Sequence, residues 1–195
     1  MAEKQFTHLH IHTEYSLLDG AIKLDQLVKR AQECEMKSLA ITDHGNIFGA
    51  VKFFELCKKA HIKPILGMEA YFAPDVAVRS VDEKYYHLLL LVQNQKGYQN
   101  LCKLICDSYT RGFYFKPRID FQMLEQYHEG LIATTACAGG YIPSLIISNQ
   151  HEQAHEAIRK FLSLFGTKRF YFEVQPIDQH EQIALNNTLY EFFLP

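Results

Sequence analysis

The chain has 195 residues, 48% of them hydrophobic, and a formal net charge of −2 at pH 7. This length fits one domain with an adequate apolar core, and the slight negative charge excludes a protein that holds nucleic acid by bulk electrostatics. Five cysteines without a CxxC pair argue against a disulfide framework or a zinc ribbon and favour a reducing, cytoplasmic compartment. The N-terminus lacks a signal-peptide pattern and the longest apolar run, Leu88 to Val92, is too short for a membrane span, so we expect a soluble protein without a membrane partner.

Short apolar runs alternate with amphipathic stretches along the chain. Hydrophobic spacing predicts strands at residues 6–11, 38–42, 64–72, 87–92, 131–135 and 169–174. It predicts helices at residues 24–36, 48–60, 97–109, 121–127, 141–148, 151–165 and 179–193. Residues 111–120, RGFYFKPRID, read as a polar and aromatic loop. The alternation favours right-handed βαβ units around a parallel sheet, either open and doubly wound or closed into a barrel.

Histidines cluster on the first predicted strand, where His8, His10 and His12 share one face. Parallel α/β folds carry their chemistry at the carboxyl ends of strands. His10 and His12 lie nearest that end, and two imidazoles at this spacing can converge on one cation; an ordinary polar face is the alternative. Three such residues span about 13 Å, so His8 is left out. Asp19, in the turn YSLLDG, is on spacing alone more typical of turn chemistry.

Two further groups of candidate residues follow or interrupt buried strands. Asp43 and His44 come directly after residues 38–42, at a carboxyl end where a functional loop belongs, although a turn with a helix cap is equally compatible. Glu69 lies inside the apolar segment ILGMEAYF, where a carboxylate requires a basic partner or a metal ion.

Two other residues are weaker candidates from spacing alone. His87 begins the apolar run LLLLV, which puts it at the wrong rim of a simple parallel barrel. Cys137 follows the strand that ends near Thr135, but a lone cysteine is usually a small buried hydrophobic residue.

Six segments in chain order resemble signatures of the PHP (polymerase and histidinol phosphatase) domain family. They are HLHIHTEYSLLDG, ITDHGNIFGAVKF, KPILGMEAYF, YHLLLLVQNQKGYQNL, RGFYFKPRID and EGLIATTACAGG. They are most similar to the version of the domain that opens the alpha subunit of bacterial DNA polymerase III. The resemblance runs from Phe6 to about Phe193 and implies an α/β fold, a distorted seven-stranded (β/α) barrel. Because an ATNDxHY-like strand should follow Pro195, we expect residues 1–195 to be a C-terminally incomplete PHP domain, without its last strand or the downstream polymerase domains.

The resemblance also implies a multinuclear metal site with up to three divalent ions, zinc, manganese or iron. His10 and His12 would hold one ion, and Glu69 would bridge to a second. His87 and Cys137 would complete the second ion's site. Asp19 and His44 would hold the third ion, with Asp43 orienting the ligands.

The implied activity is metal-dependent phosphoester hydrolysis, in the polymerase context a 3′–5′ exonuclease of the proofreading type. The implied partners are DNA and other replicative polymerase subunits. Two alternatives stay open: a non-catalytic structural and interaction module of the polymerase, and a stand-alone phosphatase resembling histidinol phosphatases. The polymerase-like segment RGFYFKPRID argues against the second.

Overall fold

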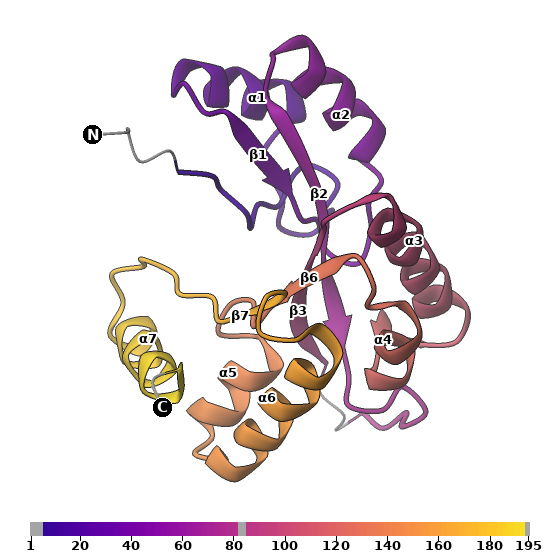
Figure 1. Ribbon diagram of the computed structural model, residues 1–195, viewed down its shortest axis with the longest axis vertical. Coiled ribbons are helices and arrows are strands. Elements are labelled where there is room, and N and C mark those ends of the chain that lie inside the picture. The colour runs from indigo at the N-terminus through magenta and orange to yellow at the C-terminus, as the bar shows by residue number, and fades with distance from the viewer. Residues whose placement is uncertain (1–5, 82–84, 194–195) are drawn as a thin grey trace. The chain divides into compact units, whose positions relative to one another are not determined.

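The protein is an α/β fold with a mixed sheet and, within its described part, seven helices (Figure 1). The computed structural model describes residues 6–81 and 85–193. The chain divides into two compact units, Met1–Glu69 and Ala70–Pro195. Among the described helices, none offers an apolar stretch of the length that a bilayer requires.

The first unit is built on two parallel strands. Its elements are α1 (Leu24–Glu33), β1 (Ser38–Ile41), α2 (Ala50–Lys59) and the first part of β2 (Lys63–Phe72). The pairing of β1 with β2 runs from Ser38 opposite Lys63 to Ile41 opposite Leu66. The predicted elements after residue 24 are therefore present in this unit, with ends that differ by a few residues.

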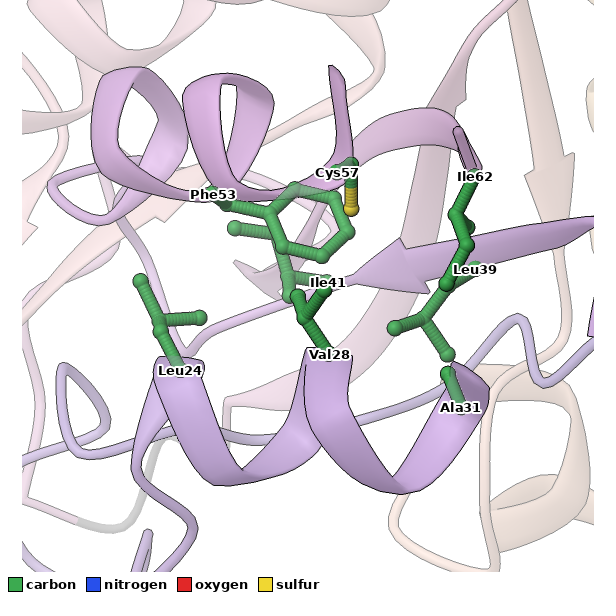
Figure 2. Packing of buried hydrophobic residues seen from close by; sticks show 8 residues of the cluster. All are labelled: Leu24, Val28, Ala31, Leu39, Ile41, Phe53, Cys57 and Ile62. Atoms are coloured by element: carbon green, nitrogen blue, oxygen red, sulfur yellow. The ribbon is translucent and has the colours of Figure 1, made fainter. Parts of the chain in front are cut away.

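One apolar layer holds the first unit together (Figure 2). Helix α1 turns Leu24, Val28 and Ala31 inward because their spacing of four and three residues places them on one face. They meet β1 and α2 in a buried cluster made of Leu24, Val28, Ala31, Leu39, Ile41, Phe53, Cys57 and Ile62. Burial raises the pKa of the Cys57 thiol to about 11, so this cysteine stays protonated and behaves as an apolar side chain.

The strand predicted at residues 6–11 is wrong, because the structure has no regular strand there. The segment still runs beside β1: the Ala40 amide donates to the His8 carbonyl (3.1 Å) and the Thr42 amide donates to the Ile11 carbonyl (2.9 Å). The acceptor residues, His8 and Ile11, are three positions apart, whereas the donor residues, Ala40 and Thr42, are two positions apart. The segment thus holds one residue more than its partner, as in a β-bulge, which breaks the strict alternation that the sequence predicts.

The second unit contains the end of β2 and the rest of the chain. Its elements are β3 (Tyr86–Val92), α3 (Gln95–Thr110), β4 (Phe113–Tyr114), β5 (Lys116–Ile119), α4 (Phe121–Tyr127), β6 (Leu131–Thr134), α5 (Tyr141–Ile147), α6 (His151–Phe165), β7 (Phe170–Tyr171) and α7 (His180–Phe193). The strands lie in the order β4-β5-β2-β3-β6-β7. Helix α3 packs against α4, and α5 packs against α6 (Figure 1).

Two sequence expectations are corrected in the second unit. The sheet is mixed rather than parallel: β2 pairs with β5 and β6 with β7 in parallel, but β3 is antiparallel to β6. Residues 111–120 are not a plain loop, because β4 and β5 form an antiparallel hairpin within them. Both features depend on strand pairing, which hydrophobic spacing does not encode.

Replacing Phe53 by alanine should lower the free energy of unfolding by about 3–5 kcal/mol, because the ring is fully buried between α1, α2 and β1 and its removal leaves a cavity. Urea unfolding followed by circular dichroism measures the change. Val51→Ala, on the same helix but 70% exposed, is the matched control and should change stability by less than about 0.5 kcal/mol. Equal losses in the two variants would contradict this account of the core.

Candidate metal centre

A buried carboxylate lies at the centre of the first unit's polar side chains. Glu69 of β2 is only 1% exposed, yet three imidazoles reach its oxygens. His10 Nε2 lies 3.1 Å from Oε1, while His12 Nε2 and His44 Nδ1 lie 3.4 and 2.9 Å from Oε2. We call these residues, together with Asp19, the Glu69 cluster. The structure thus brings together five of the seven residues that the sequence analysis expects as metal ligands.

His44 is fixed at both ring nitrogens and through its backbone. Its Nε2 lies 2.9 Å from Asp19 Oδ2, opposite the contact with Glu69. The ring of His12 stacks on it, with centroids 4.1 Å apart and planes 11° from parallel. The loop after β1 continues the parallel pairing with β2, because the Gly45 amide donates to the Glu69 carbonyl (2.9 Å). Ring and backbone contacts together give His44 one orientation.

A tight turn holds Asp19 beside His44. The amides of Asp19 and Gly20 both donate to the Ser16 carbonyl, at 3.1 and 2.7 Å. A Cβ atom on Gly20 would lie 1.8 Å from the carbonyl oxygen of Thr13, so only glycine fits where the turn closes on itself. The glycine after Asp19 therefore contributes to the position of the carboxylate.

Asp43 braces the cluster instead of joining it. Its buried carboxylate accepts hydrogen bonds from the Thr13 amide (2.6 Å), the Thr13 hydroxyl (2.8 Å) and the Ser16 hydroxyl (2.7 Å). The Ser16 oxygen in turn accepts from the His44 amide (3.1 Å). Sequence reasoning missed Thr13 and Ser16; the signal available was a pair of hydroxyls in HTEYS, directly after the histidines.

His87 and Cys137, both in the second unit, contact each other. Cys137 Sγ lies 3.5 Å from His87 Nδ1, and the His87 amide donates to the Gly139 carbonyl (2.9 Å). The reversed direction of β3 explains this contact. Because β3 is antiparallel to β6, the start of β3 lies beside the end of β6, after which Cys137 follows. His87 is therefore at a carboxyl-end rim after all.

Glu173 is a residue of this region that sequence reasoning missed. Its Oε2 accepts from the Thr134 hydroxyl (2.6 Å), which itself accepts from the amide of Ala136 (3.2 Å), the residue before Cys137. Ala136 has a φ of 57°, a conformation that needs support from its surroundings. An acidic residue just past an aromatic strand, in FYFEV, was the available signal.

The imidazoles of the Glu69 cluster differ in their affinity for protons. Burial lowers the pKa of His12 from its ordinary value, and the neighbouring His44 and His10 act in the same direction against the attraction of Glu69. Burial opposes protonation of His44 too, but hydrogen bonds and charge attraction from Glu69 and Asp19 raise its pKa overall. Without a cation in the cluster, the proton therefore resides on His44 in preference to His12.

The donor atoms of His10, His12 and Glu69 all lie within 4.8 Å of one another. Two imidazole nitrogens and a carboxylate oxygen are a donor set that suits a divalent transition metal better than calcium. The residues of the first unit thus fit the kind of ion that the sequence resemblance implies. Both the chemistry of these donor atoms and their spacing allow the group to hold a metal ion.

Residues 8–176 match the sequence model of the PHP domain. The chain belongs to the PHP domain family. It is 47% identical over 192 residues to the DNA polymerase III subunit alpha of Borreliella burgdorferi, and 46% identical over 198 residues to that of Aquifex aeolicus. Each match covers 96% of this PHP chain and 17% of the relative, so the chain spans about a sixth of the length of these curated relatives.

A solved structure shares the fold of this PHP-family chain. An amidohydrolase from Chromobacterium violaceum, solved with bound sulfate and no metal, superimposes with a TM-score of 0.53 at 15% sequence identity. The match covers 95% of this chain and 84% of the amidohydrolase. At this identity the likeness shows the fold alone.

In a buffer that contains a chelator, replacing His44 by glutamine should lower the free energy of unfolding more at about pH 6 than at about pH 9. The folded pKa of His44 is raised above the ordinary 6.5. Its stabilising contribution is therefore complete below the unfolded value and lost as pH rises through the folded value. The measurement is urea unfolding of wild type and His44→Gln at both pH values.

Repeating the comparison in a Glu69→Gln background supplies the control. Because the glutamine removes the largest attraction for the His44 proton, the pH dependence of the difference should shrink. If His44→Gln lowers the free energy of unfolding equally at both pH values, the assignment of a proton to His44 is wrong.

Proposed function

We propose that this chain is the PHP domain of a longer bacterial replicative DNA polymerase subunit and that it is a metal-dependent phosphoesterase, acting on DNA as a 3′–5′ exonuclease. The observation that carries the proposal is the buried Glu69 carboxylate with three imidazoles around it. A carboxylate in an apolar strand is costly to bury. The free-energy cost of burying this negative charge is offset best where a cation lies beside the carboxylate.

In this proposal, His10, His12 and Glu69 hold one divalent ion, and Asp19 and His44 help to hold another, with zinc, manganese or iron as the candidate metals. The support is the choice of nitrogen and oxygen donors and their convergence. When bound, such ions lower the pKa of water and offset the charge that develops on a phosphoryl group. Asp43, held by Thr13 and Ser16, keeps the segments that carry His12 and His44 in place.

His87 and Cys137 of the second unit are proposed as a further pair of ligands. A thiol sulfur 3.5 Å from an imidazole nitrogen offers the mixed sulfur and nitrogen donors that zinc prefers. Glu173 and Thr134 support the backbone turn before the cysteine. A metal shared between this pair and Glu69, as the sequence resemblance implies, stays a prediction.

The polymerase context rests on the relatives. Both of those named above are DNA polymerase III alpha subunits, and they are far longer than this chain. We therefore propose DNA and other replicative subunits as partners of the longer protein, in the cytoplasm. Residues 1–195 would form most of the PHP domain, and the seven-stranded barrel expected from the family would need strand pairing beyond that described above.

The first test measures metal binding without relying on activity. Addition of Zn²⁺ or Mn²⁺ to the chelator-treated chain should raise its thermal unfolding midpoint, because ligands that bind only the folded state stabilise it. Glu69→Gln should lose most of this rise, whereas Glu33→Gln, which removes an exposed carboxylate on α1, should keep it. A midpoint that no metal moves would remove the metal centre from the proposal.

The second test measures hydrolysis of single-stranded DNA with added Mn²⁺ or Zn²⁺. We expect release of nucleotides from the 3′ end, and a rate at least about 100-fold lower in Glu69→Gln, with Glu33→Gln unchanged. Metal binding without hydrolysis in both the chain and the longer protein would favour the alternative of a metal-stabilised structural module.

A further inference from the structure

The β4–β5 hairpin takes no part in the proposed metal centre. Phe113 pairs with Pro117 and Tyr114 with Lys116, which leaves Phe115 alone at the tip. The hairpin lies wholly within the second unit. The exposed aromatic residues of the hairpin and the backbone conformation of Phe115 are not explained by the packing of the fold.

The position of Phe115 is energetically unfavourable in two respects, its backbone conformation and the exposure of its ring. Its φ is 57°, in the left-handed region where a bulky residue is an outlier and glycine is the unstrained choice. Its side chain is also 72% exposed, and its edge contact with the neighbouring Tyr114 ring (centroids 4.6 Å apart) buries little of it, so packing compensates for little of the strain. Strained residues persist where the surrounding structure and a function require them. The position of Phe115 therefore points to a role for an exposed ring.

The other non-glycine residues with positive φ in the described part of the chain have ordinary explanations or buried settings. Glu35, His61 and Asn149 each come two residues after the end of a helix, where a left-handed residue commonly ends α-helical geometry. Ala136 is buried and supported by Thr134. Phe115 ends no helix and is not buried.

Hydrogen bonds from a buried side chain hold the base of the hairpin in place, and they fix the position of its exposed tip. Arg118 is buried, with its guanidinium donating to the carbonyls of Gly112 (3.2 Å), Val78 (3.1 Å) and Val76 (2.9 Å). The same guanidinium lies 5.3 Å from the centroid of the Tyr114 ring. A charge with this many partners locks the hairpin to the segment before β3.

Cations and further exposed rings flank the tip. Besides the buried Arg118, residues 109–119 carry two positive charges, Arg111 and Lys116, and no negative one. Tyr109 and Phe113 are exposed, with ring centroids 6.3 Å apart. Arg79 donates to the Arg111 carbonyl (3.4 Å), which brings another guanidinium to the same segment. Arg111 also pairs with Asp107 (2.9 Å), so part of this positive charge is balanced.

Exposed aromatic rings beside cations are the usual surface for single-stranded nucleic acid, since bases stack on the rings and phosphates approach the positive charges. We propose that the β4–β5 hairpin binds single-stranded DNA, with a base stacked on Phe115 and the phosphates near Arg111 and Lys116. The choice of DNA rests on the proposed function. The binding itself does not require the metal centre.

Fluorescence anisotropy with a labelled oligothymidylate of about twelve nucleotides, in low salt and a chelator, tests the proposal. The wild-type chain should bind, and Phe115→Gly should raise Kd about tenfold. Phe115→Trp should bind at least as tightly as wild type. Because glycine relieves the strain, Phe115→Gly should also unfold at an equal or higher temperature, which separates lost binding from lost folding.

Two control variants sharpen the result. Phe54→Ala removes an exposed ring from α2 and should leave Kd unchanged. Lys116→Gln should weaken binding and reduce the slope of log K against log salt by about one. Wild-type affinity in Phe115→Gly, or no binding by the wild-type chain, would overturn the proposal.

The outcome is independent of the hydrolysis experiments. Binding that depends on Phe115, in a chain without metal-dependent hydrolysis, would support the hairpin surface and count against the exonuclease. Hydrolysis that depends on Glu69, with Kd unaffected by Phe115→Gly, would overturn the hairpin surface alone.

Discussion

The need to balance one buried carboxylate governs the arrangement of the first unit. Glu69 interrupts an apolar strand and is almost fully buried, and an ionised carboxylate in such a place is tolerated only with partners. Removing one partner from a buried ion pair typically costs about 3–5 kcal/mol. Three imidazoles from two separate segments meet this need. The nitrogens that face the carboxylate are also the atoms that a divalent cation would use, so protons and a cation would compete for one set of atoms.

A second buried carboxylate in the same unit is balanced differently. Within the part of the chain that the structure describes, the Asp43 carboxylate accepts from the Thr13 amide and from the hydroxyls of Thr13 and Ser16, which are neutral donors with fixed directions. Such bonds hold a loop in place without offering a site to a cation. Neighbouring carboxylates thus have separate tasks: Asp43 fixes the loops, and Glu69 faces the imidazoles.

Local features of the fold follow from the sequence, and long-range ones do not. Hydrophobic spacing predicts helices such as residues 151–165 and strands such as residues 64–72, because it reports which side of an element is buried. It does not report the extra residue beside β1 or the reversed direction of β3, which are set by partners far along the chain. The hairpin at residues 113–119 is missed because its strands are too short for a periodic pattern.

The candidate site divides in the same way. The rule that a buried carboxylate requires a basic partner or a metal ion predicts a partner for Glu69, and the ring nitrogens of His10 and His12 lie near it. Spacing alone placed His87 at the wrong rim, and only the resemblance to the PHP family paired it with Cys137. Thr13, Ser16 and Glu173 were missed because a hydroxyl or a carboxylate gains its role from a partner that periodicity cannot reveal.

The antiparallel contact between β3 and β6 also has a consequence for the order of events during synthesis. His87 and Cys137 are 50 residues apart, so the ribosome delivers the imidazole well before the thiol. At ordinary translation speeds this interval is about 3–10 seconds. During it, β3 has no β6 to pair with. Helices such as α3 can form while the chain is still emerging, but this part of the rim has to wait for residues encoded much later.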